Sequence, residues 1–200
     1  HVTGANEEVT ITDEVALTGL KVGNKYTVWG VLMDKSTGEE LKVNDESITA
    51  EETFIADAAE MTITLTYTLD ATTLAGTTTV VFETLYTEGK EIGRHHEIDD
   101  EGQTVYIPEI HTTAADQKTG INHTEANEKA TIVDTVYYSH LLPGKEYTVH
   151  GILMDKKTGE SILIDGKEIT ASTTFTAENE EGSVDVIFTF DASILAPKTV

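Results

Sequence analysis

The chain has 200 residues, with 36 acidic and 13 basic side chains and a formal charge of −23. This charge repels phosphate backbones and anionic membranes, so it argues against nucleic-acid binding and membrane binding. Cysteine is absent, which excludes disulfides, thiolate nucleophiles and cysteine-ligated zinc. No apolar run approaches the roughly 18 residues of a membrane span.

The sequence repeats itself. The segment Tyr26–Lys35 (YTVWGVLMDK) recurs as Tyr147–Lys156 (YTVHGILMDK), at an offset of 121 residues. The offset holds without a gap from residue 5 to residue 78. A period of this length is too long for a solenoid repeat and has the size of one whole domain. We therefore predict two tandem domains, residues 1–108 and residues 109–200.

The register of the repeat leaves each copy incomplete at one end. The first copy has no equivalent of Ile110–Ile121, and the second has no equivalent of Val81–Ile107. We treat the chain as a piece of a longer protein and expect each copy to lack one or more strands, which leaves unpaired strand edges. The sequence leaves open whether those strands are disordered, deleted or supplied by another chain.

Strand patterns dominate the chain. Lys25–Met33 is rich in β-branched and aromatic residues, and Met61–Leu69 alternates strictly, so that its Ile, Leu and Tyr side chains should face the core. Thr77–Tyr86 is a further strand, and no segment shows a sustained helical apolar period. Turns are expected where the pattern Asp-x-x-Thr-Gly occurs, at Asp34–Gly38, Asp116–Gly120 and Asp155–Gly159.

Many short strands joined by turns predict an all-β protein of two tandem immunoglobulin-like β-sandwiches. The absence of cysteine argues against a disulfide-bonded immunoglobulin domain. The junction Tyr106–Ile110 is short and contains Pro108, so we expect a stiff link between the domains.

Motifs of conventional chemistry are absent. The acidic turns lack the regular oxygen ligands of an EF-hand loop, and the histidines are scattered, so we expect no metal site and no cofactor. Nucleophile-elbow, HExxH and phosphate-loop patterns are missing, which argues against a conventional enzyme. Adjacent His95 and His96 should point to opposite faces of a strand.

A polar stretch precedes the junction. If the strand through His95–Ile107 is regular, Gln103 lies on its apolar face, and Thr112 points inward from the following strand. A buried glutamine or threonine is costly unless it is bonded. From the residues alone, a hydrogen-bonded polar pair is the simplest explanation.

An ordered set of motifs resembles the Thr–Gln ester-bond domains, or VaFE repeats, of Gram-positive surface adhesins. The similarity covers nearly the whole chain, in two copies. The motifs are IxTxAxD at 110–116, TIVD at 131–134, GKEYTV at 144–149, FTFD at 188–191, VVFE at 80–83, and the stretch from His95 to DEGQT at 100–104.

The resemblance implies a sandwich domain in the stalk of an extracellular, wall-anchored adhesin. A threonine of the first strand attacks the side-chain amide of a glutamine on the last strand, ammonia leaves, and an intramolecular ester remains. It implies Gln103 as the acceptor of the first domain, Thr112 as the nucleophile of the second, and His95 as a proton acceptor or relay. A buried, protonated carboxyl would polarise the amide. The candidates are Glu83, Asp13 and Asp134, with Asp70 and Asp191 as rivals.

The same register places the threonine partner before His1 and the glutamine partner after Val200, so we expect no complete ester within either copy. The reaction would occur once per domain, which is self-modification and not enzymatic turnover. Expected partners are neighbouring repeat domains and, through other domains, a host surface ligand. The alternatives are a host-ligand-binding module and a Lys–Asn isopeptide-linked pilin-like domain, although Lys25 and Lys145 have no evident Asn partner near a terminal strand.

Overall fold

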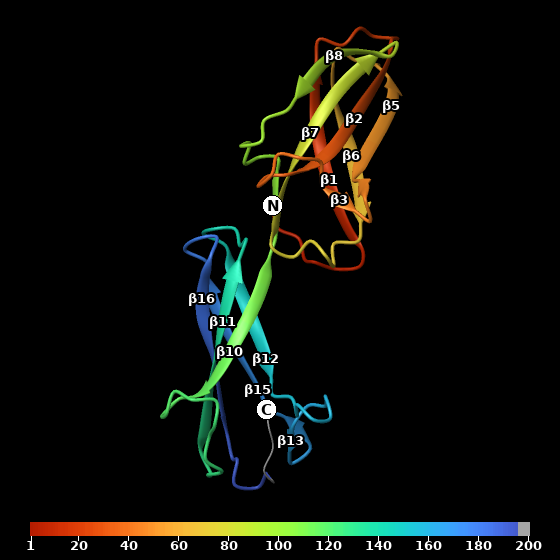
Figure 1. Ribbon diagram of the computed structural model, residues 1–200. Helices are drawn as coiled ribbons and strands as arrows, with labels where there is room; N and C mark the ends of the chain where they lie inside the picture. Colours follow the sequence, from red (N-terminus) through yellow and green to blue (C-terminus); the bar gives the residue numbers. More distant parts are fainter. Residues whose placement is uncertain (196–200) are drawn as a thin grey trace. The chain divides into compact units, whose positions relative to one another are not determined.

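The computed structural model describes residues 1–195, and that part of the chain is built from strands without a helix (Figure 1). It divides into two compact units, His1–Glu109 (unit 1) and Ile110–Val200 (unit 2). The all-β class and the two tandem domains are therefore confirmed. None of the described segments is a helix long and apolar enough to cross a membrane.

Unit 1 contains two main sheets. The first pairs β1 with β6, and the second has the order β5-β2-β7-β8, with β9 also paired to β7. β3 and β4 form a short separate pair. The strands are β1 (Val9–Thr18), β2 (Lys25–Asp34), β3 (Lys42–Val43), β4 (Glu46–Ser47), β5 (Thr49–Ile55), β6 (Glu60–Leu69), β7 (Thr77–Thr87), β8 (Lys90–His95) and β9 (Thr104–Ile107).

Unit 2 repeats the pairing of the first six strands of unit 1 and has one further strand, β10. Its sheets have the orders β10-β11-β16 and β12-β15, with β13 and β14 as a short pair. The strands are β10 (Glu109–Asp116), β11 (Ala130–Ser139), β12 (Glu146–Ile152), β13 (Leu163–Ile164), β14 (Lys167–Glu168), β15 (Thr170–Thr176) and β16 (Gly182–Phe190).

Alternation along the strands builds the core of unit 1. In β6, Ile63, Leu65, Tyr67 and Leu69 are buried, whereas the threonines between them are exposed. β1 is paired with β6 so that Ile11 lies opposite Tyr67, and Ile11 is buried as well. The apolar face that the sequence predicts for Met61–Leu69 is thus confirmed.

The Asp-x-x-Thr-Gly segments form turns, as predicted. In the first, the Gly38 N–H donates to the Asp34 carbonyl (2.8 Å), and the Asp34 carboxylate accepts from the Ser36 N–H (2.8 Å). The same glycine-to-aspartate hydrogen bond closes the turns that begin at Asp116 and Asp155. These carboxylates therefore stabilise chain reversals.

The repeat register extends to the strand pairing. Val9 lies opposite Leu69 in unit 1, and Ala130 lies opposite Phe190 in unit 2, so both partners keep the offset of the sequence. Within residues 1–195, however, β10 has no counterpart in unit 1, and β7, β8 and β9 have none in unit 2.

This difference changes the surroundings of one strand. β2 is paired with both β5 and β7, whereas its counterpart β12 is paired with β15 alone within the described part of the chain. As a result, Val31 of β2 is 3% exposed and the equivalent Ile152 of β12 is 47% exposed. The unpaired edge that the register predicts for the second copy lies at β12.

Candidate functional site

Two acidic residues occupy core positions of unit 1. Asp13 of β1 and Glu83 of β7 are 7% and 3% exposed, and their strands belong to different sheets. Burying an ionised carboxyl is costly, so protonation is favoured. Burial first, and then the neighbouring Asp13 carboxyl, raises the pKa of Glu83 to about 9. At neutral pH, Glu83 is therefore a protonated carboxyl beside Asp13.

This acid pair has unused hydrogen-bonding capacity. Asp13 Oδ2 and both carboxyl oxygens of Glu83 are buried and have no hydrogen-bond partner among the described residues. Folded proteins leave few such atoms, because each unpaired buried polar atom costs about 1–3 kcal/mol. The pair is therefore suited to receive a further polar group, such as a side-chain amide or a hydroxyl.

Tyr67 of β6 brings a hydroxyl to the same place. Its side chain is fully buried, and its hydroxyl has no hydrogen-bond partner in the described structure. The hydroxyl lies over Gly30 of β2, where even a methyl group would overlap it, and Gly30 pairs with Glu83 across the sheet. Burial, and then the charges of Asp13 and Glu83, raise the pKa of Tyr67.

Sequence reasoning placed Tyr67 on the core side of its strand and assigned it no role at the site. The signal that could have found it is Gly30, a glycine within a strand of β-branched and aromatic residues. A glycine at such a position often marks the close approach of another group. Here the approaching group is the Tyr67 hydroxyl.

His95 connects the buried acids to solvent. It lies at the end of β8, opposite Glu83, and its side chain is 42% exposed. Its Nδ1 is 3.3 Å from Glu83 Oε2, and its Nε2 is 3.2 Å from Asp100 Oδ2. A neutral imidazole can accept a proton at one nitrogen while it donates at the other, so His95 can pass protons between the core and the surface.

The two adjacent histidines point to opposite faces of the sheet, as predicted. His95 faces Glu83, whereas the His96 ring stacks on Phe82 at 4.8 Å. His96 Nε2 is also 3.0 Å from the Thr84 hydroxyl. His96 therefore fixes the start of the loop that follows β8.

That loop corrects one expectation. A regular strand does not run from His95 to Ile107, because β8 ends at His95 and residues 96–103 form turns. The Asp100 N–H donates to the Glu97 carbonyl (3.1 Å), and the Gln103 N–H donates to the Asp100 carbonyl (3.2 Å). The strand parity on which the facing of Gln103 depended is therefore lost, and all four residues of β9 are buried.

Gln103 nevertheless lies next to the strand of the acid pair. Its carbonyl accepts a hydrogen bond from the Val81 N–H (3.2 Å), two residues before Glu83 on β7. Gln103 is half-buried and lies at the end of the loop, immediately before β9. The pairing of β9 with β7 thus holds Gln103, the predicted ester acceptor, beside β7. The same strand β7 carries Glu83.

Unit 2 contains the other predicted residues. Asp134 of β11 occupies the register position of Asp13, and its Oδ1 is buried without a hydrogen-bond partner among the described residues. Thr112 lies on β10 and is exposed, so the expectation that it points inward is wrong for this structure. Most of β10 is exposed, because no described strand covers that face at Thr112.

A sequence model of the T-Q ester bond containing domain matches residues 1–107 and 108–200. The two matches together cover the whole chain. The chain belongs to this family. No curated protein sequence matches the chain significantly. The resemblance that the motifs indicated is therefore confirmed, and each unit corresponds to one T-Q ester bond domain.

The rival acids of these T-Q ester bond domains lie elsewhere. Asp70 is exposed, and its Oδ1 accepts from both the N–H (3.0 Å) and the hydroxyl (2.6 Å) of Thr72. The Thr72 hydrogen bonds lower the pKa of Asp70. Asp191 accepts from Ser193 in the same way. Both rivals therefore stabilise turns, unlike Glu83, which lies in the core.

One group of side chains in unit 1 could hold a cation. Among the described residues, His95, Glu97 and Asp100 have donor atoms that all lie within 4.8 Å of one another. His95 already faces the carboxyls of Glu83 and Asp100 through its two ring nitrogens. Both ring nitrogens of His95 therefore already face carboxyl groups of unit 1.

Proposed function

We propose that the chain is part of the stalk of a wall-anchored surface adhesin, whose T-Q ester bond domains each link their first and last strands. One observation carries the proposal. Unit 1 brings together a protonated Glu83, a buried Asp13 and His95, which contacts Glu83. Gln103 is hydrogen-bonded to β7, the strand that carries Glu83. Burying two carboxyls side by side is costly, and the packing of the domain alone does not require it.

The chemistry follows from these groups. A threonine hydroxyl is a weak nucleophile, so a base must accept its proton as the oxygen attacks the amide carbon of Gln103. The protonated Glu83 carboxyl hydrogen-bonds the amide oxygen and stabilises the charge that develops there. The C–N bond then breaks, the proton from the hydroxyl reaches the departing nitrogen, and ammonia leaves. His95, between Glu83 and Asp100, carries protons between the site and solvent.

The product is an ester between two strands that are far apart in sequence. It closes a loop of roughly one hundred residues, for which chain-entropy arguments developed for disulfides give about 4–5 kcal/mol. Burial keeps water away from the ester and so protects it from hydrolysis. A protein without cysteine thereby obtains a covalent path that carries tension along the stalk.

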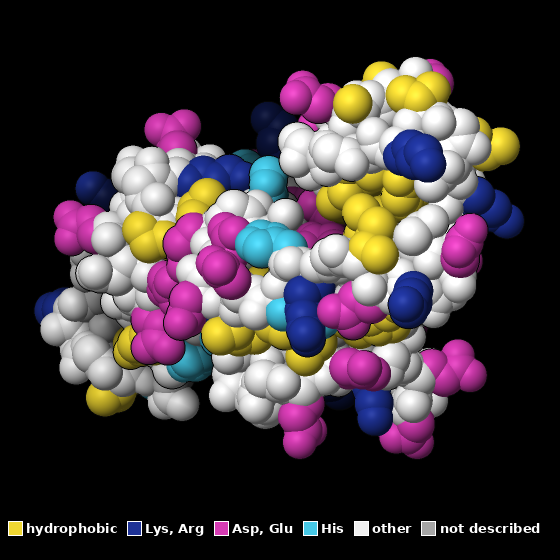
Figure 2. Space-filling view, turned by 90° about the horizontal axis from the view of Figure 1, so that it is seen from above, with side chains coloured by type: hydrophobic (Ala, Val, Ile, Leu, Met, Phe, Trp, Pro, Cys, Tyr) yellow, Lys and Arg dark blue, Asp and Glu magenta, His cyan; other side chains and the backbone are white. Residues whose placement is uncertain are grey.

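The reaction is a single event in each domain, because Gln103 is consumed. The chain therefore acts as the substrate of its own maturation, and it has no turnover. Its partners are the neighbouring domains of the same surface protein. Acidic side chains are numerous on the face that Figure 2 shows, and the charge of −23 suits an extracellular module that stays soluble.

The decisive experiment gives unit 1 a threonine strand from this same chain. Residues 109–121 are joined in front of His1, because the repeat register aligns Asn122 with His1. The added segment then places a copy of Thr112 beside β1. We expect the intact mass of the purified protein to be lower by one ammonia, and we expect hydroxylamine to cleave the link.

Matched variants separate the ester from its alternatives. Gln103→Ala should abolish the loss of ammonia, whereas Thr113→Ala in the added segment, one residue from the nucleophile, should leave it intact. A cross-link that survives hydroxylamine would indicate an isopeptide. An unchanged mass, in a protein whose added segment is protected from proteolysis by docking, would contradict the proposal.

A further inference from the structure

The outer face of unit 1 carries the only tryptophan of the chain. Trp29 lies in β2 between Val28 and Gly30, which are both buried in the core, so alternation puts the indole on the opposite face of the sheet. There it lies across from Glu51 of β5 and Thr84 of β7. A large aromatic ring on the solvent side of a sheet is a feature that core packing does not require.

Two adjoining hollows open on this face. The first has a volume of about 440 Å³ and runs between the chain turns at Asn24 and Glu88, and the second, of about 400 Å³, contains Trp29 and Glu51. Both are lined by Thr27 and by Tyr86, so they form one continuous groove, which we call the Trp29 groove. Volumes of this size are typical of ligand sites.

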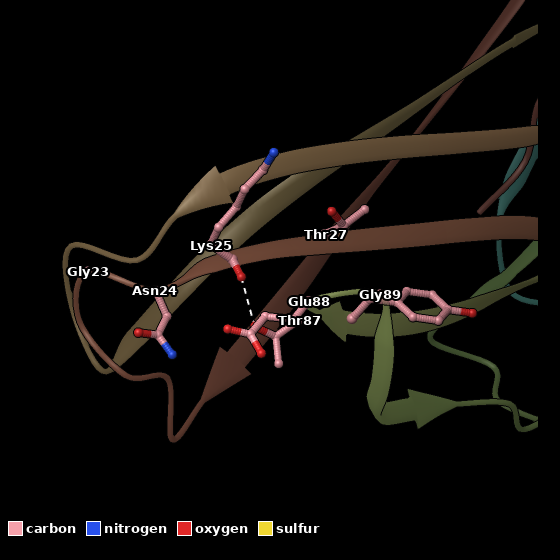
Figure 3. A pocket seen from close by; sticks show the side chains of 8 residues that line it. Gly23, Asn24, Lys25, Thr27, Thr87, Glu88 and Gly89 are labelled. Carbon is pink, nitrogen blue, oxygen red and sulfur yellow. Dashed lines mark hydrogen bonds between the residues drawn. The ribbon is translucent and has the colours of Figure 1, made fainter.

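Figure 3 shows how the two turns frame the first hollow. Asn24 lies in the turn before β2 and Lys25 begins that strand, whereas Thr87 ends β7 and Glu88 lies in the turn after it. The Thr87 hydroxyl donates to the Lys25 carbonyl (2.9 Å), which holds the two turns together. The groove is therefore preformed at this end and needs little ordering to bind.

The groove has free hydrogen-bonding groups. Within the described residues, no protein partner binds the indole N–H of Trp29, the side-chain amide of Asn24 or the carboxylate of Glu51. By contrast, the Thr27 hydroxyl is fixed by the Thr53 hydroxyl at 2.8 Å. The groove therefore contains both fixed and free polar groups beside the rings of Trp29 and Tyr86.

The positions of the groove residues in β2 and β5 can be compared with the equivalent positions of unit 2. The threonine pair of unit 1 recurs as Thr148 and Thr174, again at 2.8 Å. The positions of Trp29 and Glu51 are occupied in unit 2 by His150 and Ser172. The β2–β5 pairing and the hydroxyl pair therefore recur in unit 2, as β12–β15 with its own threonine pair. The indole, the carboxylate and the β7 side of the groove are described in unit 1 alone.

We propose that the Trp29 groove binds a neutral oligosaccharide. The indole and phenol rings offer flat apolar surfaces to the C–H faces of sugar rings, and amide, hydroxyl and carboxylate groups bond sugar hydroxyls. The groove is an open channel, which suits a chain of several sugars. The charge of −23 disfavours sulfated, sialylated and phosphorylated glycans, and this selects neutral sugars. The proposal goes beyond the ester chemistry and stands or fails separately from it.

Trp29 is the natural reporter, because no other tryptophan contributes to the fluorescence. The intact chain is titrated with neutral tetrasaccharides of glucose, mannose, galactose and N-acetylglucosamine, and with a sulfated tetrasaccharide for comparison. We expect a saturable change of the emission with a neutral tetrasaccharide, and a much smaller one with the sulfated probe. The absence of saturation with all four neutral probes, or tighter binding of the sulfated one, would overturn the proposal.

A second experiment replaces groove residues of unit 1 by the residues found at the equivalent positions of unit 2. Binding of the best neutral probe is measured by calorimetry, which does not depend on the indole. We expect Trp29→His to weaken binding about tenfold, because the stacking surface is lost, and Glu51→Ser to weaken it less. Trp29→Phe should retain part of the affinity, and His150→Ala, in unit 2, should retain all of it. Equal affinity of the parent and Trp29→His would overturn the proposal even if sugar binding were found.

Discussion

Unit 1 and unit 2 share one sequence register and differ in what surrounds the same strands. Asp13 and Asp134 occupy equivalent places, yet Asp13 meets Glu83 of β7, and unit 2 has no described counterpart of that strand. The protonated acid of the site is therefore created by β7 and its neighbours. The comparison teaches that unit 2 keeps the position of Asp13, as Asp134, whereas the strand that brings Glu83 beside this position is described in unit 1 alone.

The same contrast holds for the aromatic residue at the site. Tyr67 lies over Gly30 in unit 1, and Phe188 lies over Gly151 in unit 2. Both glycines leave room for a ring, but only unit 1 has a hydroxyl there. Four predictions test this comparison.

The first prediction concerns the two glycines. Gly30→Ala should destabilise unit 1 by about 3 kcal/mol, because the new methyl group overlaps a fully buried Tyr67 that cannot move aside. Gly151→Ala should cost unit 2 only about 1 kcal/mol. Phe188 is buried too, but β12, which carries Gly151, has an unpaired edge among the described strands and can shift to relieve the overlap. Urea unfolding followed by Trp29 fluorescence for unit 1, and by hydrogen exchange for unit 2, measures both. Equal costs would show that β7 does not confine the ring.

The second prediction compares Val31 with Ile152. Val31→Ala should cost unit 1 about 2 kcal/mol, because the side chain is 3% exposed and lies opposite Phe82 of the neighbouring β7. Ile152→Ala removes more carbon atoms but should cost about 1 kcal/mol or less, as that side chain is already 47% exposed. The two free energies of unfolding are measured as above. A larger cost for Ile152→Ala would mean that a further segment covers β12.

The third prediction concerns pH. Because the pKa of Glu83 is raised from 4.5 to about 9, the folded state retains a proton that the unfolded state releases above pH 4.5. The contribution of Glu83 to the free energy of unfolding of unit 1 should therefore be greatest below pH 4.5. It should fall as the pH rises towards 9, by up to about 1.4 kcal/mol per pH unit.

Glu83→Gln is the control for that dependence. The amide has no ionisable proton and a similar shape, so the slope between pH 4.5 and 9 should disappear in unit 1. Unfolding at several pH values, followed by Trp29 fluorescence, gives the two slopes. If Glu83→Gln retained the parental slope, another group would be responsible, and the assignment of Glu83 as the protonated acid would be lost.

The fourth prediction exchanges the aromatic residues. Tyr67→Phe should change the stability of unit 1 by less than about 1 kcal/mol, because the hydroxyl has no partner to lose among the described residues. The pKa of Glu83 should rise further, because the Tyr67 hydroxyl can turn to donate to the carboxylate once Glu83 ionises, and a phenyl ring cannot. A ¹³C NMR titration of the Glu83 carboxyl measures this. A lowered pKa would show that Tyr67 does not face the carboxylate as a donor.

Much of the fold could be predicted from local pattern. Strict alternation in Met61–Leu69 predicts which side chains are buried, because neighbouring residues of a strand face opposite sides whatever the strand pairs with. The turns at Asp34, Asp116 and Asp155 follow from side chains that bond to their own backbone. The repeat and the family motifs likewise require only the order of residues.

Part of the site could not be predicted in this way. The parity argument for Gln103 fails because turns interrupt the chain between β8 and β9, and Thr112 is exposed because burial depends on a covering strand. The Tyr67 hydroxyl was missed because its position depends on Gly30, in the opposite sheet. Each of these facts concerns residues that are distant in sequence.

The sequence by itself determined the two tandem domains, the alternating strands and the family motifs, including Glu83, His95 and Gln103. These follow from periodicity and residue type, which are local properties. Only the tertiary structure decided that Glu83 is buried beside Asp13, that His95 bridges it to Asp100, and that Trp29 lines an open groove. The reason is physical, since burial and the resulting pKa shifts arise from neighbours that strand pairing brings together.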